Sequence, residues 1–206
     1  MKIPAVKAVA HLRAVDPVLA DVIARVGPCQ ARARMEGTHF GAVMRSIVYQ
    51  QLSGSAAATI HGRVLALFGN REPTPRAVLR MDETRLRAAG LSGQKTRYIK
   101  DLALHAAERR FPMERLHELD DAAVLETLTQ VKGVGRWTAQ MFLMFRLGRP
   151  DVLPDLDLGI QKGIQQAYGL RRLPTPQQVL KRGIPWAPYR TIASWYLWRL
   201  LDLPAD

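Results

Sequence analysis

The segment VKGVGRWTAQMF, residues 131–142, carries two glycines one residue apart. Glycine costs a helix interior about 1 kcal/mol relative to alanine, so Gly133 and Gly135 indicate a tight turn between two helices. The missing side chains let another backbone approach, and the amides that start the next helix lie at the positive end of its dipole. This spacing predicts a site for an anion such as phosphate. A turn without any ligand is the alternative.

The rest of the chain has mainly the periodicity of helices, so helices must position this turn. In FGAVMRSIVYQQL, residues 40–52, apolar residues recur with the spacing of an amphipathic helix. Asp16, Thr74 and Asp82 precede further helical segments as candidate caps. The pattern predicts about ten helices and no sustained strand alternation. We expect an all-α protein.

The chain is strongly basic, with 30 Lys and Arg against 18 Asp and Glu in 206 residues, a net charge of +12. Because the surplus spreads along the whole chain, it favours a nucleic acid over a membrane as partner. A basic surface that serves solubility alone is the alternative. The single cysteine, Cys29, excludes an internal disulfide and any four-cysteine site. No apolar run is long enough for a signal peptide or a membrane span, so we expect an intracellular protein, cytoplasmic and nucleoid-associated if bacterial.

Five further blocks, in order, carry a resemblance to a known family. They are DPVLADVIARVGP, FGAVMRSIVYQQLSGSAAATI, AGLSGQKTRYIKDLA, VLPDLDLGIQKG and YRTIASWYLWR. With the glycine turn, they resemble the helix–hairpin–helix DNA glycosylase superfamily, in its 3-methyladenine DNA glycosylase II (AlkA-like) branch. The resemblance implies an all-α glycosylase unit, residues 1–206, of two helical lobes with an active-site cleft between them. One lobe would comprise residues 31–150, with the hairpin, and the other residues 1–30 and 151–206. The extra N-terminal β domain of the best-known relative would have no counterpart.

The implied reaction breaks an N-glycosidic bond through a state with positive charge on the sugar, which a nearby carboxylate stabilises. Asp155 and Asp157 are the candidates, and by spacing alone either could cap a helix. The family's catalytic aspartate is followed by x-G-hydrophobic and then a basic residue, a pattern that fits Asp157. Asp155 would then be a cap or a supporting group. Leu156 stands where many relatives have an acid.

The residue after Gly135-Arg136 separates mechanisms within the family. Enzymes that also cut the DNA backbone have a lysine there, which attacks the sugar. This chain has Trp137, so water would be the nucleophile and the enzyme monofunctional. The resemblance implies a base pocket whose aromatic faces attract positively charged alkylated purines. Its residues would be Trp137, Trp198, Met141 and Tyr49. Core packing is the alternative for Trp137, and Met141 replaces a tyrosine of the best-known relative.

A base must leave the DNA stack before it can reach such a pocket. The resemblance assigns the wedge that fills the gap to Leu52, with Gln51 beside it; alternatively, Leu52 completes the apolar stripe that begins at Phe40. The implied phosphate contacts are Gly133, Gly135, Thr138, Lys95 and Lys162. Either lysine could instead be a solvated surface charge.

The family's hairpin holds a monovalent cation through backbone carbonyls, here those of Thr129, Val131 and Val134, with Na⁺ or K⁺ as the ion. Catalysis needs no cofactor, and no iron–sulfur cluster is expected. The expected function is excision of 3-methyladenine from double-stranded DNA by a monomer, leaving an abasic site, with 7-methylguanine and 1-methyladenine as further candidate substrates. The alternatives are a glycosylase for another damaged base, or a non-catalytic helix–hairpin–helix DNA-binding protein. The latter would need neither Asp157 nor the indoles.

Overall fold

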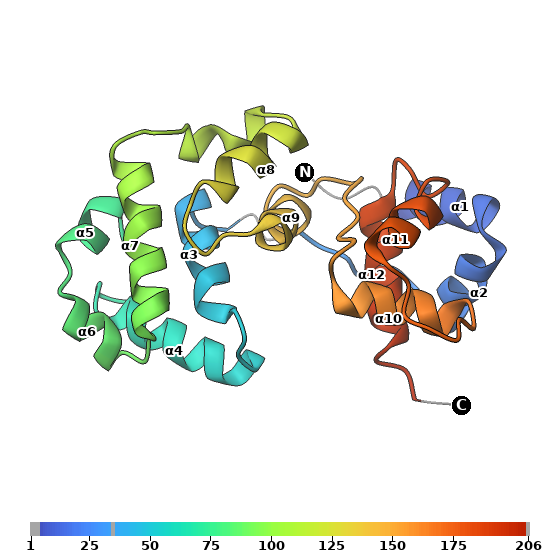
Figure 1. Cartoon of the computed structure of the whole chain (residues 1–206), viewed down its shortest axis with the longest axis horizontal. Helices are drawn as coiled ribbons and strands as arrows, with labels where there is room; N and C mark the ends of the chain where they lie inside the picture. The colour runs from blue at the N-terminus through green and yellow to red at the C-terminus, as the bar shows by residue number, and fades with distance from the viewer. Residues whose placement is uncertain (1–4, 34–35, 205–206) are drawn as a thin grey trace. The chain divides into compact units, whose positions relative to one another are not determined.

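The computed structural model describes residues 5–33 and 36–204. Every regular element in these two ranges is a helix, which confirms the all-α prediction (Figure 1). In chain order the helices are α1 (Ala5–Val15), α2 (Pro17–Val26), α3 (His39–Tyr49), α4 (Gly54–Ala66), α5 (Pro75–Arg80), α6 (Glu83–Ala88), α7 (Gly93–Ala107), the 3-10 helix η1 (Met113–Glu118), α8 (Asp121–Thr129), α9 (Arg136–Phe145), α10 (Leu158–Ala167), α11 (Pro176–Arg182) and α12 (Arg190–Leu200).

The chain divides into two compact units. The terminal unit combines Met1–Arg34 with Leu143–Asp206, and the central unit is Met35–Phe142. The expected boundaries followed residues 30 and 150. In the structure the second boundary falls within α9, so this helix belongs to both units.

Capping residues stand at the start of many of these helices. Asp16, Thr74 and Asp82 each accept a backbone N–H in the first turn of the helix that follows, as their positions predict. A cap of this kind contributes about 1 kcal/mol, because it satisfies a donor that the helix itself leaves unpaired.

The terminal unit packs α1, α2, α10 and α12 around one apolar core. Its buried members include Leu12, Leu19, Ile23, Ile160, Ile164, Trp186, Tyr196 and Leu197. Each such side chain contributes roughly 1.5–3 kcal/mol by leaving water. The packing therefore fixes the start of α10 relative to α12, and both helices carry candidate site residues.

The central unit is built around α7, which contacts α3, α5 and α6. Helix α3 also contacts α4 and η1. The apolar stripe expected in the segment 40–52 is buried at Phe40, Val43, Met44, Ile47 and Val48. This core fixes α3 against α7.

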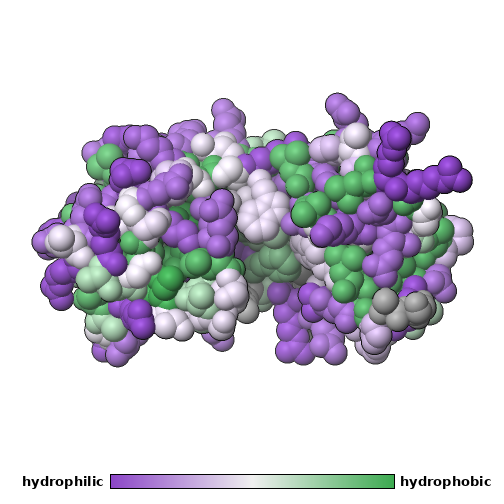
Figure 2. Space-filling model, turned by 60° about the horizontal axis from the view of Figure 1, so that its bottom comes forward, coloured by the Kyte–Doolittle hydropathy of each residue, from purple (hydrophilic) through white to green (hydrophobic). Residues whose placement is uncertain are grey.

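Hydrophilic residues cover much of the face that Figure 2 shows, and apolar patches lie between them. Among the residues with described structure, no helix combines the length and hydropathy needed to cross a bilayer.

Candidate active site

Asp157 is the N-cap of α10. Its Oδ1 atom accepts the backbone N–H of Ile160 at 2.8 Å and the indole N–H of Trp198 at 2.9 Å. The capping and functional interpretations of Asp157 are therefore compatible, since one carboxylate both starts α10 and lies against an aromatic side chain. Asp155 does not cap α10. It is buried, and its backbone carbonyl accepts the side-chain amide of Gln161 at 3.1 Å.

The ring of Trp198 lies directly against the first turn of α10. A Cβ atom added at Gly159 would come within 2.8 Å of Trp198 Cδ1 and 2.9 Å of Asp157 Oδ1, so only glycine leaves room for this pair. On another side, the Phe145 ring is 5.9 Å from Trp198 between centroids. The expected role of Trp198 was stacking on the base. The structure adds a hydrogen bond to Asp157, which the sequence did not indicate.

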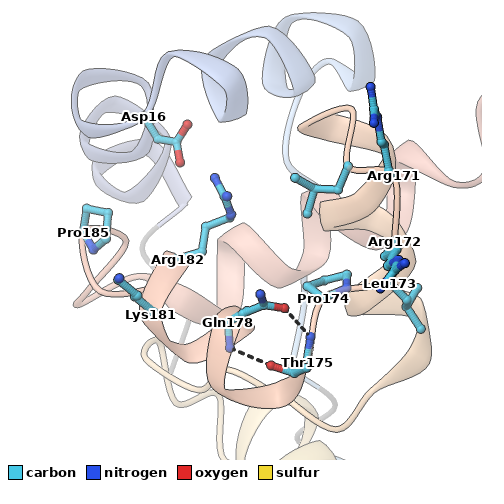
Figure 3. Close-up of a pocket in the computed structure, with 11 residues that line it drawn as sticks. Asp16, Arg171, Arg172, Leu173, Pro174, Thr175, Gln178, Lys181, Arg182 and Pro185 are labelled. Atoms are coloured by element: carbon cyan, nitrogen blue, oxygen red, sulfur yellow. Dashed lines mark hydrogen bonds between the residues drawn. The ribbon is translucent and has the colours of Figure 1, made fainter.

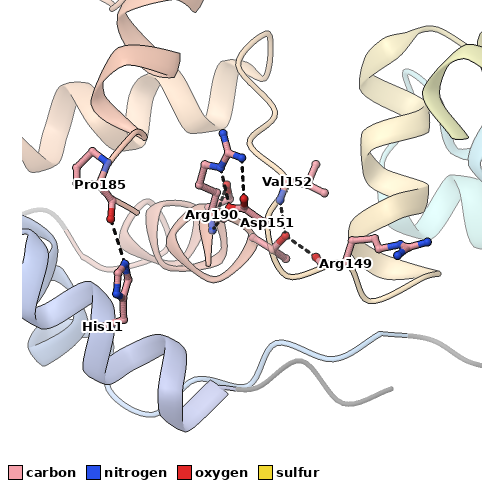
Figure 4. Close-up of polar contacts among 8 residues, drawn as sticks. His11, Arg149, Asp151, Val152, Pro185 and Arg190 are labelled. Carbon is pink, nitrogen blue, oxygen red and sulfur yellow. Dashed lines mark hydrogen bonds and ion pairs between the residues drawn. The ribbon is translucent and has the colours of Figure 1, made fainter. Parts of the chain in front are cut away.

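An ion pair at the start of α12 holds the helix that carries Trp198 (Figure 4). Arg190 donates from Nε and Nη2 to the two carboxylate oxygens of Asp151, each at 2.7 Å. Burial raises the pKa of Asp151, but the bonds from Arg190 outweigh it and hold the pKa below its usual value. Thr191 adds a second tie, because its hydroxyl donates to Arg149 O at 2.6 Å and accepts from Val152 N at 3.0 Å. These bonds join α12 to the loop that leads to Asp157.

The glycine turn lies in the central unit, and its two glycines differ. Gly133 has φ +79°, and a Cβ atom there would be 2.0 Å from the ring of Tyr98 on α7, so the fold itself requires this glycine. A Cβ atom at Gly135 would meet nothing within 4 Å. Asp101 on α7 accepts a hydrogen bond from the backbone N–H of Lys132 at 2.8 Å, which joins the turn to α7. The exposed space at Gly135 is where an outside backbone could approach.

The turn after α3 is tied to the glycine turn by Gln50, a residue that the sequence did not single out. Gln50 donates from its side-chain amide to Gly133 O at 2.9 Å, and Thr138 Oγ1 lies 3.4 Å from the same nitrogen. Lys95 on α7 donates to the carbonyls of Val48 and Gln50, both at 2.7 Å. Burial lowers the pKa of Lys95. Lys95 therefore positions the turn after α3, and its expected phosphate contact stays a prediction.

The candidate wedge follows immediately. Gln51 has φ +56°, which is uncommon for a residue with a side chain, and it is exposed. Leu52 lies beyond the end of α3 and is 39% exposed, whereas the stripe residues of α3 are buried. Leu52 therefore does not complete that stripe.

The remaining base-pocket candidates also lie in the central unit. Trp137, in the first turn of α9, is 41% exposed, so core packing does not explain it. Met141 is half-buried on the same helix. Tyr49 is half-buried, with the Arg45 guanidinium 3.9 Å from its ring centroid. Thr138 is buried.

The other candidates differ in exposure. Lys162 is exposed on α10 in the terminal unit. In the hairpin, Val131 and Val134 are buried and joined by a bond from Val134 N to Val131 O at 3.0 Å, while Thr129 is exposed at the end of α8. The Val131 carbonyl thus already accepts one hydrogen bond, and the monovalent cation site stays a prediction. No cluster of three or more His, Cys, Asp or Glu able to hold a metal occurs among the described residues.

Comparison with protein families gives one match that covers most of these residues. Residues 44–188 match the model of the HhH-GPD superfamily base excision DNA repair protein. The matched range includes the turn after α3, the glycine turn and Asp157.

Individual relatives are similar over almost the whole chain. DNA-3-methyladenine glycosylase 1 of Schizosaccharomyces pombe is 36% identical over 200 residues, which cover 96% of this chain and 88% of that protein. The solved structure of the 3-methyladenine DNA glycosylase from S. pombe in complex with abasic DNA has a TM-score of 0.87 at 35% identity, and the match covers 96% of this chain and 97% of that one. A DNA-3-methyladenine glycosidase from Bacillus halodurans has a TM-score of 0.82 at 38% identity, and the match covers 95% of this chain and 88% of that one.

Proposed function

This chain belongs to the HhH-GPD superfamily of base excision DNA repair proteins, and we propose that it is a monofunctional DNA glycosylase that hydrolyses the N-glycosidic bond of alkylated purines. Its proposed substrate is 3-methyladenine in double-stranded DNA, with 7-methylguanine and 1-methyladenine as further substrates. The product is an abasic site. The names of the relatives support this substrate class.

The observation that carries the proposal is the fixed carboxylate of Asp157. The Trp198 indole and the Ile160 amide both bind its Oδ1 atom, so the side chain has one orientation. As the glycosidic bond lengthens, the sugar becomes positively charged, and a carboxylate fixed in advance stabilises that charge without having to reorient. The cationic base leaves with the electron pair of the glycosidic bond as a neutral purine, and water then adds to the sugar carbon and releases a proton to solvent.

Alkylated purines suit such a site because the base is itself cationic. A cationic base is a good leaving group, so the enzyme needs no acid to protonate it. The exposed ring of Trp137 offers an aromatic face that attracts the same charge. Trp137 carries no amine, so it forms no Schiff base and the DNA backbone stays intact.

DNA contacts come from the turns of the central unit. The amides that start α9 bind a backbone phosphate, and Gly135 leaves room for the strand. Leu52 enters the space vacated by the extruded base, and Gln51 contacts the base left opposite. Lys162 contacts a phosphate. The protein acts as a monomer without a catalytic cofactor, and a Na⁺ or K⁺ ion held by the carbonyls of Thr129, Val131 and Val134 would stiffen the hairpin.

The test compares the native protein with Asp157→Asn on duplex DNA treated with a methylating agent, and identifies the released bases by chromatography. We expect release of 3-methyladenine by the native protein and a loss of about 100-fold or more in the variant. Binding to a duplex with an abasic-site analogue should persist in both proteins. Release of a deaminated or oxidised base instead would change the substrate class. Binding without release of any base would leave a DNA-binding module.

A further inference from the structure

A cavity of about 1060 Å³ lies in the terminal unit and shares no lining residue with the candidate active site. Its walls are the loop 170–175, helix α11 and Asp16 (Figure 3). Helix α10 separates it from Asp157, since Asp157 precedes the first residue of α10 and the loop follows its last turn. Ten residues of helix span roughly 15 Å. The Asp157 carboxylate is therefore not part of the cavity wall.

Four cations line the cavity. Arg171 and Arg172 project from the loop, and Lys181 and Arg182 come from the last turn of α11 (Figure 3). Within the described part of the chain, none of the four forms an ion pair with a carboxylate. Three of them are arginines, whose planar guanidinium binds phosphate oxygens in pairs.

The one acidic residue of the lining is Asp16, whose carboxylate oxygens accept hydrogen bonds from three neutral groups. Its Oδ1 accepts the Leu19 amide at 3.0 Å, and its Oδ2 accepts the Tyr168 hydroxyl and the Trp186 indole N–H, the latter at 2.8 Å. Burial raises the pKa of Asp16, but these bonds outweigh it and keep the pKa below its usual value. The lining thus carries four cationic side chains and one ionised carboxylate, a formal surplus of three positive charges.

Part of this arrangement is fixed before any ligand arrives. The Arg182 guanidinium lies 3.9 Å from the centroid of the Tyr168 ring, a cation–π contact that limits its movement. Thr175 and Gln178 exchange hydrogen bonds of 2.8 and 3.3 Å in a capping box that fixes the start of α11. Arg182 therefore loses less side-chain entropy on binding than a mobile arginine would.

We propose that this cavity binds a ligand that carries a chain of phosphate groups. A single phosphate engages one or two arginines, whereas four cations around a space of about 1060 Å³ accommodate several phosphates at once. A free inorganic polyphosphate and the backbone of a nucleic acid strand share this chemistry. The cavity is thus a second anion site, independent of the excision reaction.

The four tryptophans allow a site-resolved test by NMR, because each indole N–H gives one signal. Trp186 reports on the cavity through Asp16, and Trp198 reports on Asp157. We expect inorganic tripolyphosphate, hexathymidylate or both to shift the Trp186 signal until it saturates. A shift with tripolyphosphate alone identifies a free polyphosphate as the ligand class, and a shift with hexathymidylate identifies a nucleic acid backbone.

The cavity variant Arg171→Gln/Arg172→Gln should weaken this binding at Trp186 by about ten-fold or more. The control Arg76→Gln/Arg80→Gln removes the same charge from exposed positions of α5 and should leave the affinity measured at Trp186 unchanged. An unmoved Trp186 signal with both anions overturns the proposal, as does equal binding by both variants. A hexaglutamate peptide that shifts Trp186 as strongly would overturn the phosphate assignment. The excision rate of the cavity variant, measured separately, should equal that of the native protein. A failure of the cavity proposal can therefore be told apart from a failure of the glycosylase proposal.

Discussion

The indole N–H of Trp198 and the backbone N–H of Ile160 converge on the same oxygen of Asp157, at 2.9 and 2.8 Å. Trp198 is on α12 and Ile160 on α10, so the carboxylate is oriented by two helices that pack against each other in the terminal unit. Gly159 makes this approach sterically possible. Trp198 thus acts as a positioning residue for Asp157. This role is separate from any stacking of its ring on a base.

Replacing Trp198 by phenylalanine separates these two roles, because it keeps an aromatic face and removes the N–H donor. A hydrogen bond to a charged group contributes about 1.5–3 kcal/mol, so we expect single-turnover excision to slow by roughly 10- to 100-fold. Binding to abasic DNA should change little. Trp195→Phe is the matched control, because Trp195 lies on the same helix and does not contact Asp157 through any bond in the structure. An unchanged rate in Trp198→Phe would leave Trp198 with a stacking role alone.

The two glycines of the hairpin should respond differently to alanine. Gly133→Ala combines a positive φ with a clash against Tyr98, so we expect the variant to lose stability by about 1 kcal/mol or more. Gly135→Ala has open space and should keep the native melting temperature. Its new methyl group would instead obstruct a DNA strand, so DNA affinity should fall. Thermal melting and fluorescence anisotropy on a duplex measure the two effects. Equal DNA affinity of Gly135→Ala and the native protein would contradict the assigned phosphate contact.

Two lysines on α7 make the same kind of contact with different turns. Lys95 donates to the carbonyls of Val48 and Gln50, and Lys100 donates to those of Leu79 and Met81, at 2.8 and 2.6 Å. In each of Lys95→Met and Lys100→Met, two carbonyls lose their hydrogen-bond donor. Because an unmade hydrogen bond costs about 1–3 kcal/mol, we expect both variants to lose a similar free energy of unfolding of roughly that size.

Only the Lys95→Met variant should impair base extrusion, because only its turn carries Gln51 and Leu52. The measurement is the fluorescence of 2-aminopurine placed beside the target base, which rises when the base leaves the stack. We expect a smaller rise for Lys95→Met, a native rise for Lys100→Met, and partial recovery in Lys95→Arg. Equal signals from the two methionine variants would mean that the Lys95 bonds serve stability alone.

The sequence predicted what local spacing controls. The apolar stripe of α3, the caps at Asp16, Thr74 and Asp82, and the all-α class all follow from residues within a few positions of one another. The family pattern selected Asp157 over Asp155, and the structure shows that Asp157 caps α10, as spacing alone allowed for either aspartate. The roles of the individual site residues remain predictions, because sequence similarity does not measure them.

The missed features are bonds between residues far apart in the chain. Lys95 binds carbonyls 47 and 45 positions earlier, and Gln50 reaches Gly133, 83 positions later. A lysine of a basic protein looks like any other surface charge until the packing of α3 on α7 brings those carbonyls to it. The Trp198–Asp157 bond spans 41 positions and depends on the absence of a side chain at Gly159. Such pairs are set by tertiary packing, which periodicity does not encode.

Asp16 should make the stability of the protein depend on pH in the acidic range. Its folded-state pKa is below the ordinary value of 3.8, so it stabilises the native state fully above that value and progressively less as the pH falls through the folded pKa. Asp151 contributes in the same direction. We expect the melting temperature of the native protein to fall steeply below about pH 4.

Asp16→Asn keeps a side chain that can cap α2 but removes the charge that receives the Tyr168 and Trp186 donors. At neutral pH the variant should be less stable by roughly 1.5–3 kcal/mol, the magnitude of hydrogen bonds to a charged group. It should also lose less further stability on acidification than the native protein does. Asp21→Asn, on the exposed side of the same helix, is the control and should melt like the native protein at every pH. If the difference in melting temperature between the native and Asp16→Asn proteins stayed constant from pH 3 to 7, it would contradict the role assigned to this carboxylate.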